Sequence, residues 1–121
     1  MTGRKILLVD DNADSVRLLE LVLAAQGHAI RTALDGASAI AEAGSFVPDL
    51  VLLDLSLPDL DGFEVAGRLH AIPELAGVAI VALTGWSDPE VVARARRSGF
   101  SELLVKPVDL DTLDQLLART P

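Results

Sequence analysis

Polar side chains that could bind a metal ion and a phosphoryl group follow four short apolar runs of this sequence. In chain order they are Asp10, Asp11, Asp54, Thr84 and Lys106. The runs that precede them cover residues 6–9, 50–53, 78–83 and 103–105. If these side chains meet, three carboxylates, one hydroxyl and one ammonium form a site suited to a divalent cation and a phosphoryl group.

The apolar runs have the pattern of strands that are buried on both faces of a parallel sheet. They are short, continuous and bounded by polar residues. In an open α/β sheet, ligands bind at the edge where the parallel strands have their carboxyl ends. We therefore expect the polar residues that follow the runs to converge at one edge of one sheet.

The charges of such a site favour a cation. Two carboxylates roughly 4 Å apart repel by about 4 kcal/mol at an effective dielectric of about 20. Three together must take up protons or bind a cation, and Mg²⁺ commonly binds through carboxylates, waters and phosphate oxygens. With Mg²⁺ and Lys106 the formal charge of the site is zero, and a phosphoryl group on Asp54 lowers it to about −1. The site can hold both states, as a switch requires.

Asp54 is the expected nucleophile, because it ends a central strand and opens a loop with room for a tetrahedral group. A carboxylate can attack a phosphoryl group to give an acyl phosphate. Asp10 and Asp11 lie where a strand leads into a helix, which suits metal binding, and Lys106 would contact a phosphoryl oxygen as a point charge. Each motif alone has an ordinary explanation, such as helix capping or a turn. Their coincidence at successive strand ends favours a site.

Composition bounds the protein to a single domain over residues 1–121, half of it apolar. The absence of cysteine excludes disulfides, thiolate metal sites and cysteine nucleophiles. A net charge of −8 disfavours nucleic acid or an anionic membrane as a direct partner. No apolar stretch approaches the roughly 20 residues of a membrane span, and no signal-peptide pattern is present. We expect a soluble cytoplasmic protein.

Strand and helix patterns alternate five times, which predicts a parallel sheet covered on both faces. The strands are expected at about 5–9, 29–33, 50–54, 78–83 and 103–105. The helices are expected from Asn12 to Gly27, from after Asp35 to near Gly44, from Phe63 to Ala71, from a capping box of Ser87 and Glu90 to Gly99, and after Asp109. The inward stripe of the first helix is predicted to be Leu18, Leu19, Val22 and Leu23, and that of the last is Leu110, Leu113, Leu116 and Leu117.

Four motifs resemble the receiver domain of two-component response regulators, in order, in spacing and over essentially the full chain. They are Leu8–Asn12, Asp54–Gly62, Ala82–Gly85 and Val105–Pro107. The sequence of residues 99–109 is most similar to receivers of hybrid histidine kinases. The resemblance implies a flavodoxin-like three-layer sandwich with five helices and a five-stranded sheet in the order 2-1-3-4-5.

The resemblance also implies a function, that of a phosphoacceptor signalling domain. Asp54 would accept a phosphoryl group from a phosphohistidine on a histidine kinase or a histidine phosphotransfer protein, and the two states would bind a downstream protein differently. Thr84 and Lys106 would bind the phosphoryl group, and the Lys106–Pro107 bond would be cis. The implied Mg²⁺ ligands are Asp10, Asp11, Asp54 and the backbone carbonyl of Ser56.

Two positions depart from the family pattern. Receivers usually have Tyr or Phe three residues before the lysine, where this chain has Leu103. A switch based on a rotating aromatic is therefore not expected, and we predict that the change on phosphorylation lies in residues 84–90. Trp86, two residues after Thr84, is expected near the mouth of the site.

Two other functions compete with this interpretation. The first is a phosphorylation-independent interaction module of the same fold, which would be indicated by a missing site residue, and none is missing. The second is an aspartyl-nucleophile phosphatase, which would carry a second acidic residue where this chain has Ser56. The expectation is therefore a signalling protein that catalyses only its own phosphotransfer and dephosphorylation. His28, His70 and the arginines Arg94, Arg96 and Arg97 are expected to be solvated.

Overall fold

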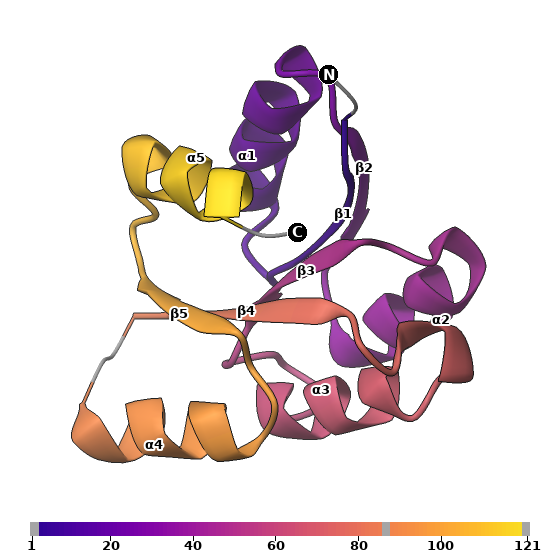
Figure 1. The fold of residues 1–121 in the computed structure, drawn as a ribbon, viewed down its shortest axis with the longest axis vertical. Helices are drawn as coiled ribbons and strands as arrows, with labels where there is room; N and C mark the ends of the chain where they lie inside the picture. The colour runs from indigo at the N-terminus through magenta and orange to yellow at the C-terminus, as the bar shows by residue number, and fades with distance from the viewer. Residues whose placement is uncertain (1–2, 86–87, 120–121) are drawn as a thin grey trace.

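The computed structural model describes residues 3–85 and 88–119 and consists of alternating strands and helices (Figure 1). The strands are β1 Lys5–Val9, β2 Ala29–Ala33, β3 Leu50–Asp54, β4 Ala79–Thr84 and β5 Glu102–Val105. The α-helices are α1 Ala13–Ala25, α2 Gly36–Phe46, α3 Gly62–His70, α4 Pro89–Arg97 and α5 Leu110–Arg119. A 3₁₀ turn, η1 Pro73–Leu75, precedes β4.

The strands form one parallel sheet in the order β2-β1-β3-β4-β5. Its register aligns the carboxyl ends of neighbouring strands. Val9 pairs with both Ala33 and Leu53, and Thr84 pairs with Val105. The predicted flavodoxin-like fold and strand order are confirmed, and the register fixes which residues leave the sheet side by side.

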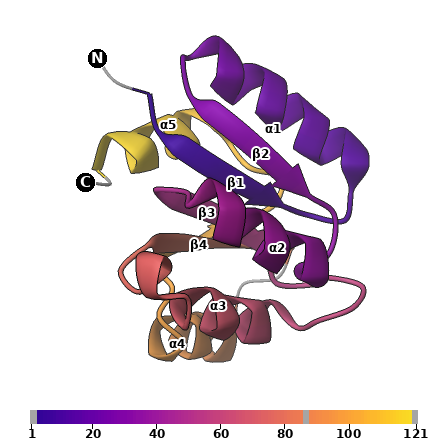
Figure 2. The same cartoon turned by 90° about the vertical axis from the view of Figure 1, so that its right-hand side faces the viewer.

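Helices cover both faces of the sheet (Figures 1 and 2). Alternate strand residues point to opposite faces. In β1, Ile6 and Leu8 pack with α1 and α5, whereas Leu7 and Val9 pack with α2, α3 and α4. The central strand β3 is buried at all five positions. Because both faces are covered, polar groups that serve a function are left to the sheet edges and loops.

Most helix boundaries follow the predicted caps. The Asn12 side chain accepts a hydrogen bond from Ser15 N at 3.1 Å at the start of α1. Gly27 and Gly99 take positive φ values of 95° and 89° after α1 and α4, as the predicted helix ends require. The predicted end of α2 near Gly44 is early, because the helix continues to Phe46.

The start of α4 differs from the prediction. Its N-cap is Asp88, whose side chain accepts a hydrogen bond from Val91 N at 2.9 Å, and Pro89 takes the first helical position. An aspartate next to proline therefore replaces the predicted capping box of Ser87 and Glu90. The expectations for Trp86 and Ser87 themselves lie outside the described residues.

The predicted inward stripe of α1 is wrong in part. Leu18 is 62% exposed, and the buried residues of this helix are Val16 and Leu23. Seven residues, nearly two full helical turns, separate these two, so they share one face of the helix. Leu18 is two positions from Val16, a rotation of about 200°, and lies on the other side. In α5 the inward residues Leu113, Leu116 and Leu117 are confirmed, but Leu110 at the start of the helix is exposed. Within the described residues, no helix is long and apolar enough to cross a membrane.

Candidate functional site

The five polar residues singled out from the sequence lie at the carboxyl edge of the sheet. Asp54 and Thr84 are the last residues of β3 and β4. Asp10 directly follows β1, and its backbone N–H donates to Ala33 O at 3.2 Å. Lys106 directly follows β5, and its backbone N–H donates to Thr84 O at 2.8 Å. The predicted convergence is therefore observed.

Lys106 bridges two of the carboxylates. Its Nζ lies 2.9 Å from Asp54 Oδ2 and 2.8 Å from Asp10 Oδ2. The sequence predicted contact with a phosphoryl oxygen, and the structure adds that the ammonium holds both carboxylates together. The Lys106–Pro107 peptide bond is cis, as the family resemblance implies.

Backbone amides hold the second oxygen of each of these carboxylates. Asp10 Oδ1 accepts a hydrogen bond from Asn12 N at 3.0 Å, and Asp54 Oδ1 accepts one from Ser56 N at 2.9 Å. Both carboxylates therefore have a fixed orientation, with one oxygen toward Lys106 and one toward the loop that follows the strand. The sequence pattern did not indicate these amide contacts.

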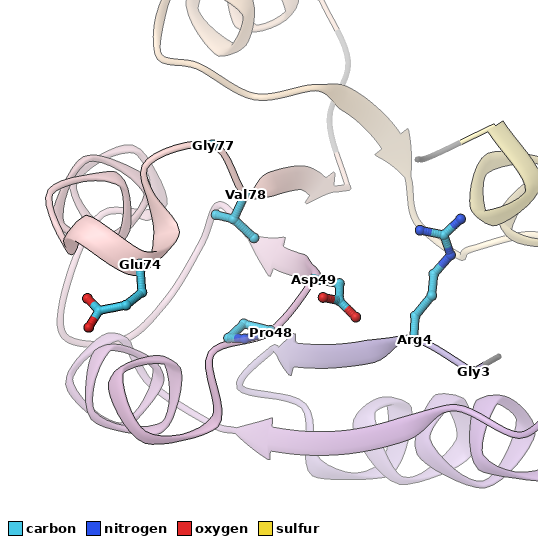
Figure 3. A pocket seen from close by; sticks show the side chains of 7 residues that line it. All are labelled: Gly3, Arg4, Pro48, Asp49, Glu74, Gly77 and Val78. Carbon is cyan, nitrogen blue, oxygen red and sulfur yellow. The ribbon is translucent and has the colours of Figure 1, made fainter.

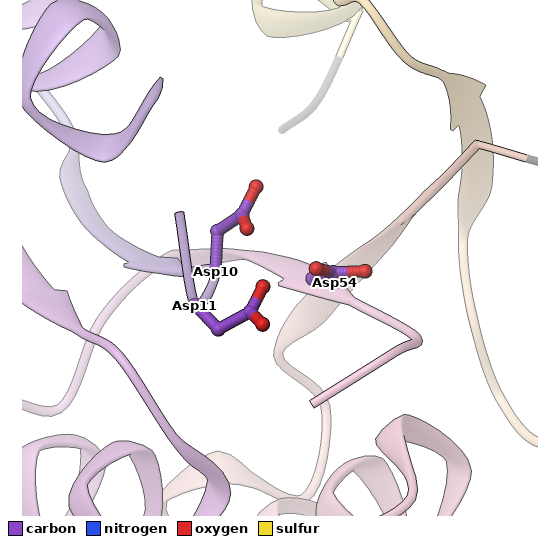
Figure 4. Close-up of side chains that lie close together, drawn as sticks. All are labelled: Asp10, Asp11 and Asp54. Carbon is purple, nitrogen blue, oxygen red and sulfur yellow. The ribbon is translucent and has the colours of Figure 1, made fainter. Parts of the chain in front are cut away.

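The third carboxylate completes an acidic cluster. Oxygens of Asp10, Asp11 and Asp54 all lie within 4.8 Å of one another (Figure 4). Asp10 and Asp54 are only 5% and 3% exposed, whereas Asp11 is exposed. With Lys106 the formal charge of the cluster is −2, so a divalent cation balances it. The donors are all oxygens, which suits a hard ion such as Mg²⁺.

Asp10 and Asp54 have pKa values shifted in opposite directions. Burial raises the pKa of Asp54, and hydrogen bonds from Ser56 N and Lys106 offset only part of that effect, so the pKa lies above its ordinary value. Burial also raises the pKa of Asp10, but hydrogen bonds from Lys106 and Asn12 N outweigh it, and the pKa lies below its ordinary value. Asp54 thus carries the less stabilised charge of the two.

The pKa of Lys106 is shifted as well. Burial lowers it, but the hydrogen bonds and charges of Asp10 and Asp54 outweigh the burial, so the pKa lies above its ordinary value. Lys106 therefore stays a cation at neutral pH. A fixed positive charge beside Asp54 can stabilise negative charge that arrives on a phosphoryl group.

The loop after β3 folds back tightly and keeps Ser56 at the site. Ser56 and Asp61 form an antiparallel bridge, and Gly62 N donates to Leu55 O at 3.2 Å. A Cβ at Gly62 would lie 2.6 Å from Leu55 Cα and 2.9 Å from Asp54 O, so only glycine fits this approach. At the tip, the Asp59 carboxylate binds the first two amides of α2. The sequence alone did not indicate this contact.

An apolar groove of about 490 Å³ adjoins the acidic cluster. It lies between α1 and the start of α5, with Asp10 and Lys106 at its wall. Its apolar lining is Leu18, Leu19, Leu83, Pro107, Val108 and Leu110. The two exposed leucines, Leu18 and Leu110, therefore both line a groove that opens beside the site.

Both histidines are half-buried and hydrogen-bonded, so the expectation of solvated rings is wrong. His28 Nδ1 accepts a hydrogen bond from Arg4 N at 3.0 Å, and His70 Nε2 donates to Val78 O at 3.1 Å. Both partners precede strands, at the edge opposite the acidic cluster. Arg94 is exposed, as expected, and its guanidinium also lies 3.9 Å from the centre of the Phe63 ring. Arg96 and Arg97 are exposed.

The sequence matches the model of a protein family described as the response regulator receiver domain, over residues 6–118. This chain belongs to the receiver domain family. Receiver domains are signalling modules of two-component systems that take phosphoryl groups from histidine kinases and typically bind Mg²⁺ at an acidic pocket. This chain has an acidic cluster of Asp10, Asp11 and Asp54 at the carboxyl edge of its sheet.

Relatives and solved structures agree with this assignment. The response regulator PleD of Caulobacter vibrioides is 38% identical over 105 residues, which are 87% of this chain and 23% of PleD. The CAI-1 autoinducer sensor kinase/phosphatase CqsS of Vibrio cholerae is 32% identical over 91% of this chain and 16% of CqsS. The receiver chain thus spans less than a quarter of either relative. The chemotaxis protein CheY4 of Vibrio cholerae superposes over 100% of both chains with a TM-score of 0.93 at 28% identity.

Proposed function

We propose that residues 1–121 form one receiver unit in which Asp54 takes a phosphoryl group from a phosphohistidine. The donor is a histidine kinase or a histidine phosphotransfer protein. The observation that carries the proposal is the bridge from Lys106 to Asp54 and Asp10, at 2.9 Å and 2.8 Å. It holds a buried carboxylate with a raised pKa beside a fixed cation, which is the arrangement that a phosphoryl acceptor needs.

The transfer is a displacement at phosphorus. One oxygen of the Asp54 carboxylate attacks, a new O–P bond forms and the N–P bond of the phosphohistidine breaks. The electron pair of that bond stays on the imidazole nitrogen, which takes up a proton. The products are an acyl phosphate on Asp54 and a free histidine on the donor.

The acidic cluster would hold Mg²⁺ through Asp10, Asp11, Asp54 and the backbone carbonyl of Ser56. Bound there, the ion would neutralise negative charge on the phosphoryl oxygens. The carboxylates themselves are held in place for this role by the amides of Asn12 and Ser56. Without a cation, the −2 charge of the cluster would repel a phosphoryl donor.

Thr84 and Lys106 would contact the transferred group. Both side chains leave neighbouring strand ends that are joined by the hydrogen bond from Lys106 N to Thr84 O. After transfer, Lys106 would exchange its contact with the Asp54 carboxylate for one with a phosphoryl oxygen. The end of β4 and the loop between β5 and α5 would then respond to the phosphoryl group, and a downstream protein would bind the two states differently.

Intact-mass measurement with acetyl phosphate as donor tests the proposal. The protein is expected to gain the mass of one phosphoryl group with Mg²⁺ and none with EDTA, and Asp54→Asn is expected to gain none. Equal labelling of the wild type and Asp54→Asn, or labelling that EDTA leaves unchanged, would contradict it. A wild type that never labels would favour the phosphorylation-independent interaction module.

A further inference from the structure

Asp59 ties the loop between β3 and α3 to the start of a different helix. We propose that Asp59 is a positioning residue, which holds the Ser56 backbone where a metal ion can use its carbonyl oxygen. The inference rests on the proposed function, because it concerns the Mg²⁺ site of that reaction. Asp59 itself contacts neither the cluster nor the reacting atoms.

The contacts of Asp59 join two segments that are distant in sequence. Its Oδ1 accepts hydrogen bonds from Gly36 N at 2.7 Å and Leu60 N at 2.9 Å, and its Oδ2 accepts one from Ala37 N at 3.0 Å. Gly36 and Ala37 are the first two residues of α2, whose amides have no partner within the helix. The hydrogen bonds from Gly36 and Ala37 hold the pKa of Asp59 below its ordinary value. Its carboxylate therefore stays charged and bound at neutral pH.

A second carboxylate at the same helix end allows the attachment to be separated from capping. Asp35, the N-cap of α2, accepts a hydrogen bond from Ser38 N at 2.7 Å. That contact lies within one turn of chain, whereas Asp59 reaches back 23 residues to Gly36. Both aspartates satisfy free amides of α2, but only Asp59 fixes the loop against the helix.

Next to Asp59, the loop and the start of α2 are also tightly packed. A Cβ on Gly36 would lie 2.9 Å from Leu60 Cβ and 2.9 Å from Val65 Cγ2. The first residue of α2 must therefore be small for Leu60 to lie against it. Apolar packing of Leu60 and the hydrogen bonds of Asp59 therefore both hold the loop against the helix.

The tip of the loop is coupled to the site through its base. Asp59 lies between the two residues of the Ser56–Asp61 bridge, so the bridge closes a small hairpin with Asp59 near its tip. Ser56 N in turn donates to Asp54 Oδ1 at 2.9 Å. Freeing the tip from α2 would loosen the base and move the Ser56 carbonyl. Mg²⁺ needs near-ideal octahedral geometry at about 2.1 Å, so small displacements of a ligand weaken binding.

Titration calorimetry with Mg²⁺ alone tests the inference on Asp59→Ala, with Asp35→Ala as the matched control. Both substitutions remove a carboxylate from the α2 end, and both are expected to lower the melting temperature by a few degrees. Asp59→Ala is expected to weaken Mg²⁺ binding by about tenfold, as loss of an outer support does at other metal sites. Asp35→Ala is expected to change it by less than about twofold.

Asp59→Asn covers the case in which the alanine variant does not fold. Its amide oxygen keeps one acceptor for the α2 amides, so an intermediate loss of Mg²⁺ affinity is expected. Equal Mg²⁺ affinities for the wild type, Asp59→Ala and Asp59→Asn would overturn the positioning role, as would equal losses in Asp59→Ala and Asp35→Ala. A wild type that binds no Mg²⁺ would instead contradict the proposed function, and the inference with it.

Discussion

The two edges of the sheet differ in how they use their charged residues. The amino edge has the larger hollow, about 560 Å³ against about 490 Å³ for the groove beside the acidic cluster. Its lining is Gly3, Arg4, Pro48, Asp49, Glu74, Gly77 and Val78 (Figure 3). Arg4 and Glu74 lie well apart there, and Asp49 accepts a hydrogen bond from Lys5 N at 2.9 Å. At the carboxyl edge the charged side chains of Asp10, Asp54 and Lys106 are in direct contact. The close approach of charged groups, and not the volume of the hollow, therefore marks the site.

Helix polarity explains why acidic groups gather at the carboxyl edge. Each parallel strand leads from this edge into the N-terminus of a helix, where free amides favour negative charge. The N-caps of α1, α2, α3 and α4 are Asn12, Asp35, Asp61 and Asp88. The same geometry that stabilises these caps can stabilise an incoming phosphoryl group. The amino edge, which receives helix C-termini, lacks this advantage.

The sequence has two lysines, one at each edge, and they form the sharpest test of the comparison. Lys106→Ala is expected to slow labelling by acetyl phosphate by about a hundredfold, because it removes a fixed cation from the transferred group. Lys5→Ala is expected to change the rate by less than about twofold, since the Lys5 ammonium lies over the Phe46 ring and away from the cluster. Rates from intact-mass time courses measure both.

The Lys106→Ala variant should also keep or gain Mg²⁺ affinity, because a cation that competes for Asp10 and Asp54 is gone. Loss of Mg²⁺ binding together with labelling would mean that Lys106 acts by holding the site together.

Two aspartates at opposite edges give a test of metal binding. Asp10→Asn removes one charge of the cluster and is expected to weaken Mg²⁺ binding by about tenfold or more, which corresponds to about 1.4 kcal/mol. Asp49→Asn, directly before β3, is expected to leave Mg²⁺ binding unchanged. Calorimetric titrations of the two variants under the same ionic strength decide the matter. Comparable losses would place the cation elsewhere.

The raised pKa of Asp54 predicts how the site affects stability without a cation. For an acid whose pKa is higher in the folded state, the free energy of unfolding falls as pH rises through that pKa, because the unfolded state ionises more easily. At pH 7 in EDTA the Asp54 charge therefore destabilises the fold, and Asp54→Asn is expected to melt a few degrees higher than the wild type.

The advantage of Asp54→Asn should shrink as pH falls toward the ordinary value of 3.8, and when Mg²⁺ is added. Calorimetric melting curves at pH 7 and pH 5 measure it. An Asp54→Asn protein that melts below the wild type at pH 7 in EDTA would show that the hydrogen bond to Lys106 outweighs burial.

Leu103 should give the smallest effect. It is half-buried on β5 and packs against the core on the side of α2, α3 and α4. Leu103→Phe is expected to change labelling by less than about threefold. Amide chemical shifts with and without beryllofluoride should change mainly in residues 84–90 and little around Leu103. Large shifts along β5 would show that this strand takes part in the switch.

The strands and the site were predictable because both follow from local patterns. Continuous apolar runs specify buried parallel strands, and parallel strands bring the residues after them to one edge. Asp10, Asp11, Asp54, Thr84 and Lys106 were found in this way. The bridging contacts of Lys106 were not, because they depend on the reach of a side chain across three strands.

Two side-chain contacts between distant segments outside the acidic cluster were not predictable from the sequence. Asp59 looks like a turn residue, since its partners at Gly36 and Ala37 lie 23 and 22 residues earlier. The stacking of Arg94 on Phe63 likewise joins two helices that are separate in sequence. In both cases the residue type has an ordinary local explanation, and only the packing of helices around the sheet reveals the other one.

Locating the modified residue tests the central claim most directly. The protein is treated with acetyl phosphate and Mg²⁺, digested at neutral pH and mapped by peptide mass spectrometry, with an EDTA-treated sample alongside. The account predicts one added phosphoryl group, only on the peptide that contains Asp54, labile to hydroxylamine as an acyl phosphate is, and absent with EDTA. A label on His28 or His70, on a peptide of the amino edge, or at Asp54 without any divalent cation would contradict it.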